Sequence, residues 1–248
     1  MVEKVEGLVI DVVRHNDRND IVSLYTRTRG RVSFLSPVAS SRRTRGRNAM
    51  LMPLSCVSAD VNFRSDRRLH TLPALSPGRI WHTLYFNPVK SSMLLFLSEF
   101  LNALLRYDTP DEGLYRYLTG SLEVLDALPT ERVANFHIAF MTGMLDFMGI
   151  RPPVEDWHSG MIFDMSAAEF RHTDVPGAVF PVQSTLLGEA DAAYAALLGR
   201  MTYRNMHRFR LVRGQRWRLL TMLLRYYSLH LPFKPELKSL DVLKELFN

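Results

Sequence analysis

The spacing of apolar residues changes near Pro77, and this change constrains the fold more than any other feature of the 248-residue chain. Before Pro77, short runs rich in β-branched residues alternate with turn residues, which predicts strands. We expect strands at 7–13, 21–26, 32–35, 50–63 and 69–75, the fourth being either one bent strand or two. Five short strands separated by turns favour a small closed barrel, and the OB-fold is the commonest five-stranded one.

After Pro77 the apolar residues follow the period of a helix. From Asn87 to Arg106 they recur every three to four positions, and Pro88 takes the first helical position, where proline is favoured. Further helices are expected at 109–128, from Thr130 to a stop at Gly149, and at 186–198, 215–230 and 238–247. The sequence therefore predicts an α+β protein, with a five-stranded OB-fold barrel over 1–78 and an all-α helical domain over 79–248.

The helical period is lost between residues 150 and 187. This interval contains Pro152, Pro153, Pro176 and Pro181. Because proline interrupts helices and central strands, we expect a small irregular insertion within the helical domain, with short strand pieces such as 161–165.

Charge is distributed unevenly along the chain. Residues 1–80 hold fourteen Lys/Arg and seven Asp/Glu, a net charge of +7. Residues 81–199 have a net charge of −9, and residues 200–248 have a net charge of +8. Thirteen of the first fourteen basic residues are arginine, whose guanidinium matches phosphate oxygens in pairs. Basic surface of this kind attracts polyanions and favours a nucleic-acid partner.

The densest basic cluster is the loop around residues 42–47. No acid occurs between Asp20 and Asp60. The loop holds four arginines in six residues: Arg42, Arg43, Arg45 and Arg47. Four close arginines repel one another, a cost that a merely solvated loop would not need, so we interpret the cluster as a DNA contact. Three more arginines, Arg64, Arg67 and Arg68, flank the last hairpin and would extend the same surface, with Asp66 as a single opposing charge.

A second basic stretch runs from Arg200 to Arg225. It holds eight arginines, and no acid lies between Asp191 and Glu236. Because Arg200, Arg204 and Arg208 are four residues apart, they are expected to form one stripe on a helix. This stripe would contact nucleic acid or an acidic peptide; a solvated helix face, or ion pairs with the acidic middle of the chain, are the alternatives.

The sequence contains no recognisable catalytic or metal site. Cys56 is the only cysteine, which excludes a disulfide framework and a zinc site made of several thiolates. The patterns GxxxxGK[ST], HExxH and GxSxG are absent, and His158 and His172 fit no ligand spacing. We therefore predict a protein that is not an enzyme and has no metal. A nuclease using carboxylates of the acidic middle and an RNA-binding OB protein are the alternatives.

Aromatic residues and His137 are interpreted mainly as core. The sets concerned are Phe136, Phe140 and Phe147; Trp217, Tyr226 and Tyr227; and, in the barrel, Tyr25, Phe34 and Phe63, which would otherwise offer stacking faces to bases. The N-terminus lacks the pattern of a signal peptide, and the apolar run 93–97 is too short to span a bilayer, so we expect a cytoplasmic protein with no membrane partner.

Several segments resemble the RecO family of bacterial recombination mediators and DNA-repair proteins. They are the opening strands and polar hairpin EGLVIDVVRHNDRNDIVSLYTRTRGRVSFLS, the basic loop VASSRRTRGRNAMLMPLS, the helix FHIAFMTGMLDFMGIRPP, and the C-terminal LLRYYSLHL and LKSLDVLKELF. Each segment is moderately specific alone. Their order and spacing along nearly the whole chain carry the resemblance.

The resemblance implies an N-terminal OB-fold followed by a helical domain with a small insertion. It also implies binding to single- and double-stranded DNA, annealing of complementary strands, and help in loading recombinase onto single strands. The implied partners are RecR and the acidic C-terminal tail of single-strand-binding protein (SSB), and the chain alone is expected to be a monomer at the nucleoid. The DNA-binding residues carried over are Arg42, Arg43, Arg45 and Arg47, and the tail is a candidate ligand for Arg200, Arg204 and Arg208.

One departure from the family concerns zinc. Many relatives carry four zinc-binding cysteines in the insertion, whereas residues 150–190 of this chain contain none. We therefore expect no zinc and no other cofactor. The insertion would then be held by apolar contacts of Trp157, Met161, Phe163 and Phe170.

Overall fold

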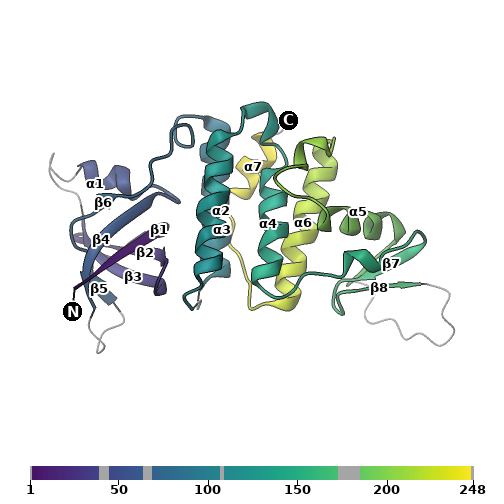
Figure 1. Cartoon of the computed structure of the whole chain (residues 1–248), viewed down its shortest axis with the longest axis horizontal. Coiled ribbons are helices and arrows are strands. Elements are labelled where there is room, and N and C mark those ends of the chain that lie inside the picture. Colours follow the sequence, from purple (N-terminus) through teal and green to yellow (C-terminus); the bar gives the residue numbers. More distant parts are fainter. Residues whose placement is uncertain (1, 39–44, 64–68, 107–108, 173–184, 247–248) are drawn as a thin grey trace. The chain divides into compact units, whose positions relative to one another are not determined.

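A computed structural model describes residues 2–38, 45–63, 69–106, 109–172 and 185–246, with the backbone alone for Arg45, Arg47 and Leu246 (Figure 1). The chain forms two compact units. The first unit comprises residues up to Leu128 together with Pro235–Leu246, and the second comprises Pro129–Lys234. The predicted boundary at residue 78 marks the change from strands to helices, whereas the compact units divide later because helices pack with the sheet.

The first unit contains a six-stranded sheet. Its strands are β1 (Val2–Arg14), β2 (Asn19–Thr26), β3 (Gly30–Pro37), β4 (Cys56–Asn62), β5 (Leu69–Thr71) and β6 (Ser76–Pro77). The order across the sheet is β5-β3-β2-β1-β4-β6, and only β3 and β5 run parallel. Gly30 allows the tight β2–β3 turn because its φ of 62° is a conformation that favours glycine.

The sheet is curled but not closed, so the predicted closed barrel is wrong while the OB-like, α+β character is confirmed. Each edge strand pairs with one neighbour: β5 with β3, and β6 with β4. The curl brings Phe63, just after β4, to 6.5 Å from the ring of Phe34 on β3. Inward-facing residues of β1 to β4 form one buried core inside the curl.

Two local expectations also differ from the structure. Within the loop expected around residues 42–47, a short helix, α1 (Arg45–Met50), begins at Arg45, and the fourth strand starts only at Cys56. The connection between them turns at Leu54, which has a φ of 57°. Of the strand expected at 69–75, only Leu69–Thr71 forms a strand, β5, and the two-residue β6 follows it at Ser76–Pro77.

Three helices complete the first unit. They are α2 (Pro88–Leu104), α3 (Glu112–Ala127) and α7 (Leu240–Leu246). The side chain of Asn87 accepts hydrogen bonds from the backbone N–H groups of Val89 and Lys90, which confirms the predicted helix start. The hydroxyl of Ser98 on α2 donates to the carbonyl of Ile10 on β1 at 2.6 Å, which fixes the helix against the sheet.

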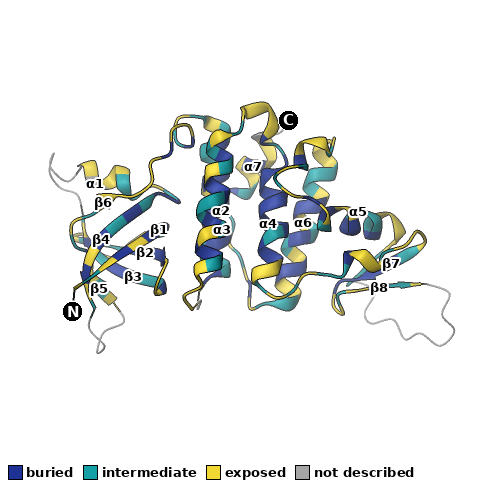
Figure 2. Ribbon diagram, viewed as in Figure 1, coloured by how far each residue is buried: buried dark blue, intermediate teal, exposed yellow. Residues whose placement is uncertain are grey.

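In the described residues, the second unit contains three α-helices and the insertion. The helices are α4 (Phe136–Phe147), α5 (Glu189–Gly199) and α6 (Arg213–His230). Figure 2 shows buried residues along α4, whose sequence is mostly apolar, and along α6, where leucines and tyrosines are buried and several arginines are not. The helix expected from Thr130 begins only at Phe136, because Thr130–Arg132 forms a separate 3₁₀ turn. Its predicted stop is confirmed, since Gly149 has a φ of 66°.

The insertion is more regular than predicted. It forms a three-stranded sheet of β8 (Glu169–His172), β7 (Met161–Asp164) and β9 (Leu186–Leu187), in that order. Phe163 and Phe170 are buried, with ring centroids 4.6 Å apart, as the expected apolar contacts require. In the described residues, no helix is long and apolar enough to cross a membrane.

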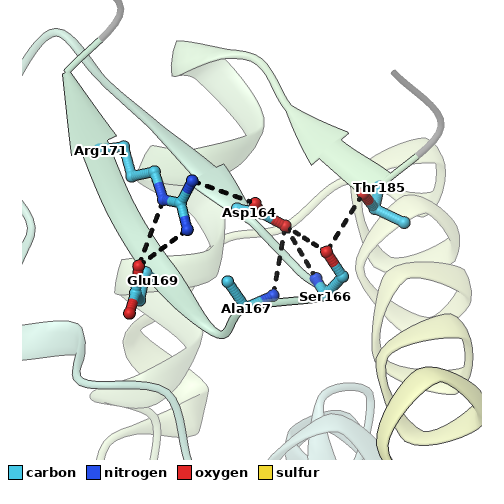
Figure 3. A network of polar contacts seen from close by, with 6 residues as sticks. All are labelled: Asp164, Ser166, Ala167, Glu169, Arg171 and Thr185. Carbon is cyan, nitrogen blue, oxygen red and sulfur yellow. Dashed lines mark hydrogen bonds and ion pairs between the residues drawn. The ribbon is translucent and has the colours of Figure 1, made fainter. Parts of the chain in front are cut away.

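A polar network around Asp164 adds to these apolar contacts (Figure 3). The fully buried carboxylate of Asp164 accepts hydrogen bonds from the N–H and hydroxyl of Ser166 and from the N–H of Ala167. A guanidinium nitrogen of Arg171 lies 3.7 Å from its other oxygen. Burial raises the pKa of Asp164, but the hydrogen bonds from Ser166 and Ala167 outweigh burial and hold the pKa below its ordinary value. The carboxylate therefore fixes the β7–β8 turn.

Candidate nucleic-acid interface

Most of the predicted DNA-binding arginines lie outside the described residues. This holds for Arg42, Arg43, Arg64, Arg67 and Arg68. Arg45 and Arg47 belong to α1, and the structure describes only the backbone of these two residues. The assignment of these seven arginines to DNA binding therefore stays a prediction, and the structure contributes the positions where their segments are anchored.

The segment 39–44 is anchored beside the β1–β2 turn. At its start, the N–H of Val38 donates to the carbonyl oxygen of Arg18 at 2.8 Å, and at its end α1 begins at Arg45. The side chain of Arg18 is exposed and makes no ion pair with a described residue. Nearby Arg14 pairs with Asp20 at 3.1 Å. Arg18 is thus an exposed cation at the point where the arginine loop leaves the sheet, whereas its sequence context predicts only a turn residue.

The segment 64–68 is anchored at the opposite end of β3. Its last flanking residue, Leu69, pairs with Ser33 in the middle of β3, in the parallel β3–β5 pair. Its first flanking residue, Phe63, lies 4.0 Å below the guanidinium of Arg29, in the β2–β3 turn. Val38 and Phe63, each of which flanks one predicted arginine cluster, therefore lie near opposite ends of β3, a strand of eight residues that is roughly 25 Å long.

Other arginines of the first unit are engaged within the protein. Arg27 pairs with Glu112 and Arg29 with Glu3, each at 2.5 Å, and Arg79 pairs with Glu123. Hydrogen bonds from Arg29 and Arg27 lower the pKa of Glu3 and of Glu112 respectively. The half-buried Arg31 donates to the carbonyl and side-chain oxygens of Asn102, and burial lowers its pKa. Much of the positive charge counted in residues 1–80 is thus compensated outside the two clusters.

The second basic stretch does not form the predicted helix stripe. Arg200 caps the C-terminus of α5, Arg204 lies in a turn, and Arg208 ends a 3₁₀ helix, Met206–Arg208. The turn forms because the side chain of Asn205 accepts from the N–H of Thr202 and donates to the carbonyl of Arg200. All three arginines are nevertheless exposed.

This stretch is held in place by a buried asparagine. The side-chain amide of Asn135 donates to the carbonyls of Met206 and Phe209, at 2.9 and 2.8 Å. Two of the eight arginines bond to described residues: Arg216 donates to the carbonyl of Leu211, and Arg218 pairs with Asp191 at 2.6 Å. The result is an ordered, irregular segment with exposed arginines.

An apolar groove of about 270 Å³ lies on α5 next to this segment. Its lining residues are Trp157, Ala190, Ala193, Tyr194, Ala196, Leu197 and Arg200. The hydroxyl of Tyr194 accepts a hydrogen bond from Gln215 at 2.7 Å, which fixes one wall of the groove to α6. A groove with apolar walls and a guanidinium suits an apolar segment that carries a carboxylate.

Several acids of the middle of the chain have structural roles. Asp111 caps α3, Glu112 and Glu123 are in ion pairs, and Asp126 accepts from the N–H groups of His82, Thr83 and Leu84. Within the described ranges, no group of three or more His, Cys, Asp or Glu gathers as a metal site would require. Burial lowers the pKa of His137 to about 3, so this residue is neutral at pH 7.

The aromatic residues divide into core and surface. Tyr25, Phe34, Phe136, Phe140, Tyr226 and Tyr227 are buried, as expected. Phe147 was expected in the core but is 36% exposed. Phe86, for which no role was predicted from the sequence, is 84% exposed.

Comparison with known proteins gives agreement over the whole chain. A family model described as "Recombination protein O N terminal" matches residues 1–79, and one described as "Recombination protein O C terminal" matches residues 85–241. The chain is 37% identical over 248 residues to the "DNA repair protein RecO" of Phocaeicola vulgatus, and 35% identical over 249 residues to that of Bacteroides fragilis, each covering both chains fully. It is 32% identical to that of Porphyromonas gingivalis, over 98% of each chain.

Proposed function

The chain belongs to the RecO family, and from this membership we propose that it acts in DNA repair and homologous recombination as a mediator. It binds single- and double-stranded DNA, anneals complementary strands, and helps to load recombinase onto single strands coated with SSB. The observation that carries the proposal is similarity to proteins named for DNA repair along the full length of the chain.

The proposed mechanism requires no bond chemistry, and the protein is not an enzyme. Arginines neutralise phosphates on two strands and so lower the repulsion between them, while base pairing selects the partner strand. The proposed contacts are Arg42, Arg43, Arg45, Arg47, Arg64, Arg67 and Arg68. Because the flanking residues Val38 and Phe63 lie near opposite ends of β3, a DNA strand that runs along β3 is proposed to contact both clusters. Arg18, exposed at one of these ends, is a further proposed phosphate contact.

The second unit is proposed to bind the acidic C-terminal tail of SSB. The groove on α5 supplies apolar walls, and Arg200 supplies a partner for a carboxylate. Arg204 and Arg208 are exposed on the segment that Asn135 holds in place, and would attract the other acidic residues of the tail. RecR is proposed as a second protein partner of the chain, which alone is a monomer and works in the cytoplasm at the nucleoid.

We propose that the protein needs no zinc. The chain has one cysteine, Cys56 on β4, at the start of that strand in the sheet of the first unit. In the insertion, the buried pair of Phe163 and Phe170 and the network around Asp164 connect the strands through protein groups, which supports this proposal.

A strand-annealing assay tests this function. Complementary strands coated with SSB are mixed with the protein, with and without RecR, and duplex formation is followed. We expect annealing above the rate with SSB alone, and recombinase loading that depends on RecR. Annealing no faster than with SSB alone would contradict the proposal, and Mg²⁺-dependent cleavage of the strands would indicate the nuclease alternative.

A further inference from the structure

We propose that Phe86 stacks on a nucleobase of single-stranded DNA and thereby favours single strands over duplex. This inference rests on the proposed DNA binding. At 84% exposure, Phe86 is the most exposed large hydrophobic side chain in the described part of the molecule. It follows Ile80, which is 67% exposed, in the segment that connects β6 to α2.

The sequence around the start of α2 explains why Phe86 stays outside. Asn87 caps the helix, and an apolar residue just before a cap commonly packs on the fourth helical residue. Here the fourth residue is Ser91, whose hydroxyl donates to the carbonyl of Pro88 instead. Phe86 therefore lacks its usual apolar partner, and no ring contact joins it to another described aromatic residue.

The backbone that presents Phe86 is held by hydrogen bonds on several sides. The indole of Trp81 donates to the carbonyl of Leu54 at 3.2 Å, and the hydroxyl of Tyr85 donates to the carbonyl of Pro53 at 3.1 Å. The N–H of Phe86 itself donates to the carbonyl of Thr83 at 3.2 Å. A ring presented from an ordered backbone loses little conformational entropy on binding.

The acids that contact this segment are already compensated. Asp126 accepts from three backbone N–H groups and from the hydroxyl of Thr83. The buried ammonium of Lys90 donates to Thr83 and to the carbonyl of Asp126, each at 2.8 Å. Glu123 pairs with Arg79. A DNA backbone approaching Phe86 would therefore meet no uncompensated carboxylate of this network.

The position of the segment also connects it with the proposed phosphate contacts. Pro53 and Leu54, to which Tyr85 and Trp81 are bonded, follow closely after α1, the helix that contains Arg45 and Arg47. A strand whose phosphates lie along α1 would have bases within reach of the same side of the first unit.

A nucleobase fits the surroundings of Phe86 better than a protein pocket. Anchors of protein interfaces lie at the centre of a contiguous apolar patch. Between the exposed Ile80 and Phe86, the large residues Trp81 and Leu84 are buried and His82 and Thr83 are exposed polar residues, so the two exposed side chains do not form a continuous apolar run along the chain. Stacking needs only the free face of a ring, and the faces of bases are free in single strands but covered in duplex.

The test compares three DNA ligands: an oligothymidylate, an abasic strand of the same length, and a hairpin duplex. We expect Phe86→Ala to weaken binding of the oligothymidylate about tenfold and to leave binding of the abasic strand and of the duplex unchanged. Phe86→Trp should retain the affinity of the wild type. Leu95→Ala, at a side chain 41% exposed on α2, is the matched control and should change none of the three.

Two results would overturn the stacking role. One is an unchanged affinity of Phe86→Ala for oligothymidylate, and the other is equal weakening on the abasic strand. Loss of RecR or SSB binding with unchanged DNA affinities would identify Phe86 as a protein anchor instead. If the wild-type protein bound none of the three ligands, the proposed DNA binding would fail as well. Wild-type binding with an unaffected Phe86→Ala variant rejects the stacking role alone.

Discussion

The N–H of Val38 donates a hydrogen bond to the carbonyl oxygen of Arg18 at 2.8 Å. This bond fixes the end of β3 to the β1–β2 turn, and the proposed DNA-binding loop departs from this junction. Arg18 is therefore bonded through its backbone to the residue before that loop, and its exposed side chain offers a direct test of the surface.

Arg18→Ala should reduce the salt dependence of single-strand binding. If Arg18 contacts one phosphate, the slope of log K against log salt concentration should fall by about 0.7. Arg27→Ala is the matched control, because Arg27 is engaged with Glu112. Equal slopes for Arg18→Ala and the wild type, measured by fluorescence titration at several salt concentrations, would exclude Arg18 from the interface.

Charge reversal at Arg200 should impair binding of the SSB tail. We expect Arg200→Glu to weaken binding of a labelled tail peptide about tenfold or more, because it places a carboxylate in the groove on α5. Arg204→Glu and Arg208→Glu should have smaller effects, since neither lines the groove. Arg225→Glu, at an exposed position on α6, is the control. If Arg200→Glu, Arg204→Glu and Arg208→Glu all bound the peptide as the wild type does, the assignment of the tail to the groove on α5 would be wrong.

Removal of metal should leave the protein intact, whereas removal of the Asp164 carboxylate should not. Asp164→Ala leaves the N–H groups of Ser166 and Ala167 without their acceptor, at a cost of about 1–3 kcal/mol. We expect a thermal midpoint several degrees lower for this variant and an unchanged midpoint for the wild type in EDTA. Stoichiometric zinc in the purified protein, or a lower midpoint in EDTA, would contradict the metal-free insertion.

The buried His137 should make the protein less stable in mild acid. Burial lowers its pKa to about 3 in the folded state, whereas the unfolded chain binds the proton near the ordinary value of 6.5. The unfolded state thus binds more protons between these values, so the free energy of unfolding is highest above pH 6.5 and falls as pH decreases towards 3. Urea titrations at a series of pH values should show this fall, and His137→Gln should reduce the slope. A variant with the wild-type slope would contradict the assignment to His137.

Features determined by local chemistry could be predicted from the sequence. Asn87 and Pro88 start α2, and Gly149 ends α4, because capping and positive φ depend on residues within one turn. The strands β1 to β3 were also expected, since β-branched runs between turn residues depend little on distant contacts. The family resemblance, drawn from the order of five segments, was confirmed by the matches over the whole chain.

Features determined by tertiary contacts could not be predicted. The stripe expected at Arg200, Arg204 and Arg208 fails because side chains of Asn135 and Asn205 bond to backbone carbonyls and hold a turn there. The open edges of the sheet depend on pairings that no single strand encodes. The exposure of Phe86 does have a local signal in the sequence. An apolar residue just before a helix cap commonly packs on the fourth helical residue, and in α2 that residue is the polar Ser91.

The salt dependence of DNA binding by a variant with Arg42, Arg43, Arg45 and Arg47 changed to Ala tests the central claim most directly. We expect a folded protein whose slope of log K against log salt concentration for single strands is smaller by about 0.7 for each phosphate that an arginine no longer neutralises. Replacing the same four residues with Lys should keep most of the slope, because the charges remain. A folded alanine variant with the slope of the wild type would contradict the assignment of this loop to DNA.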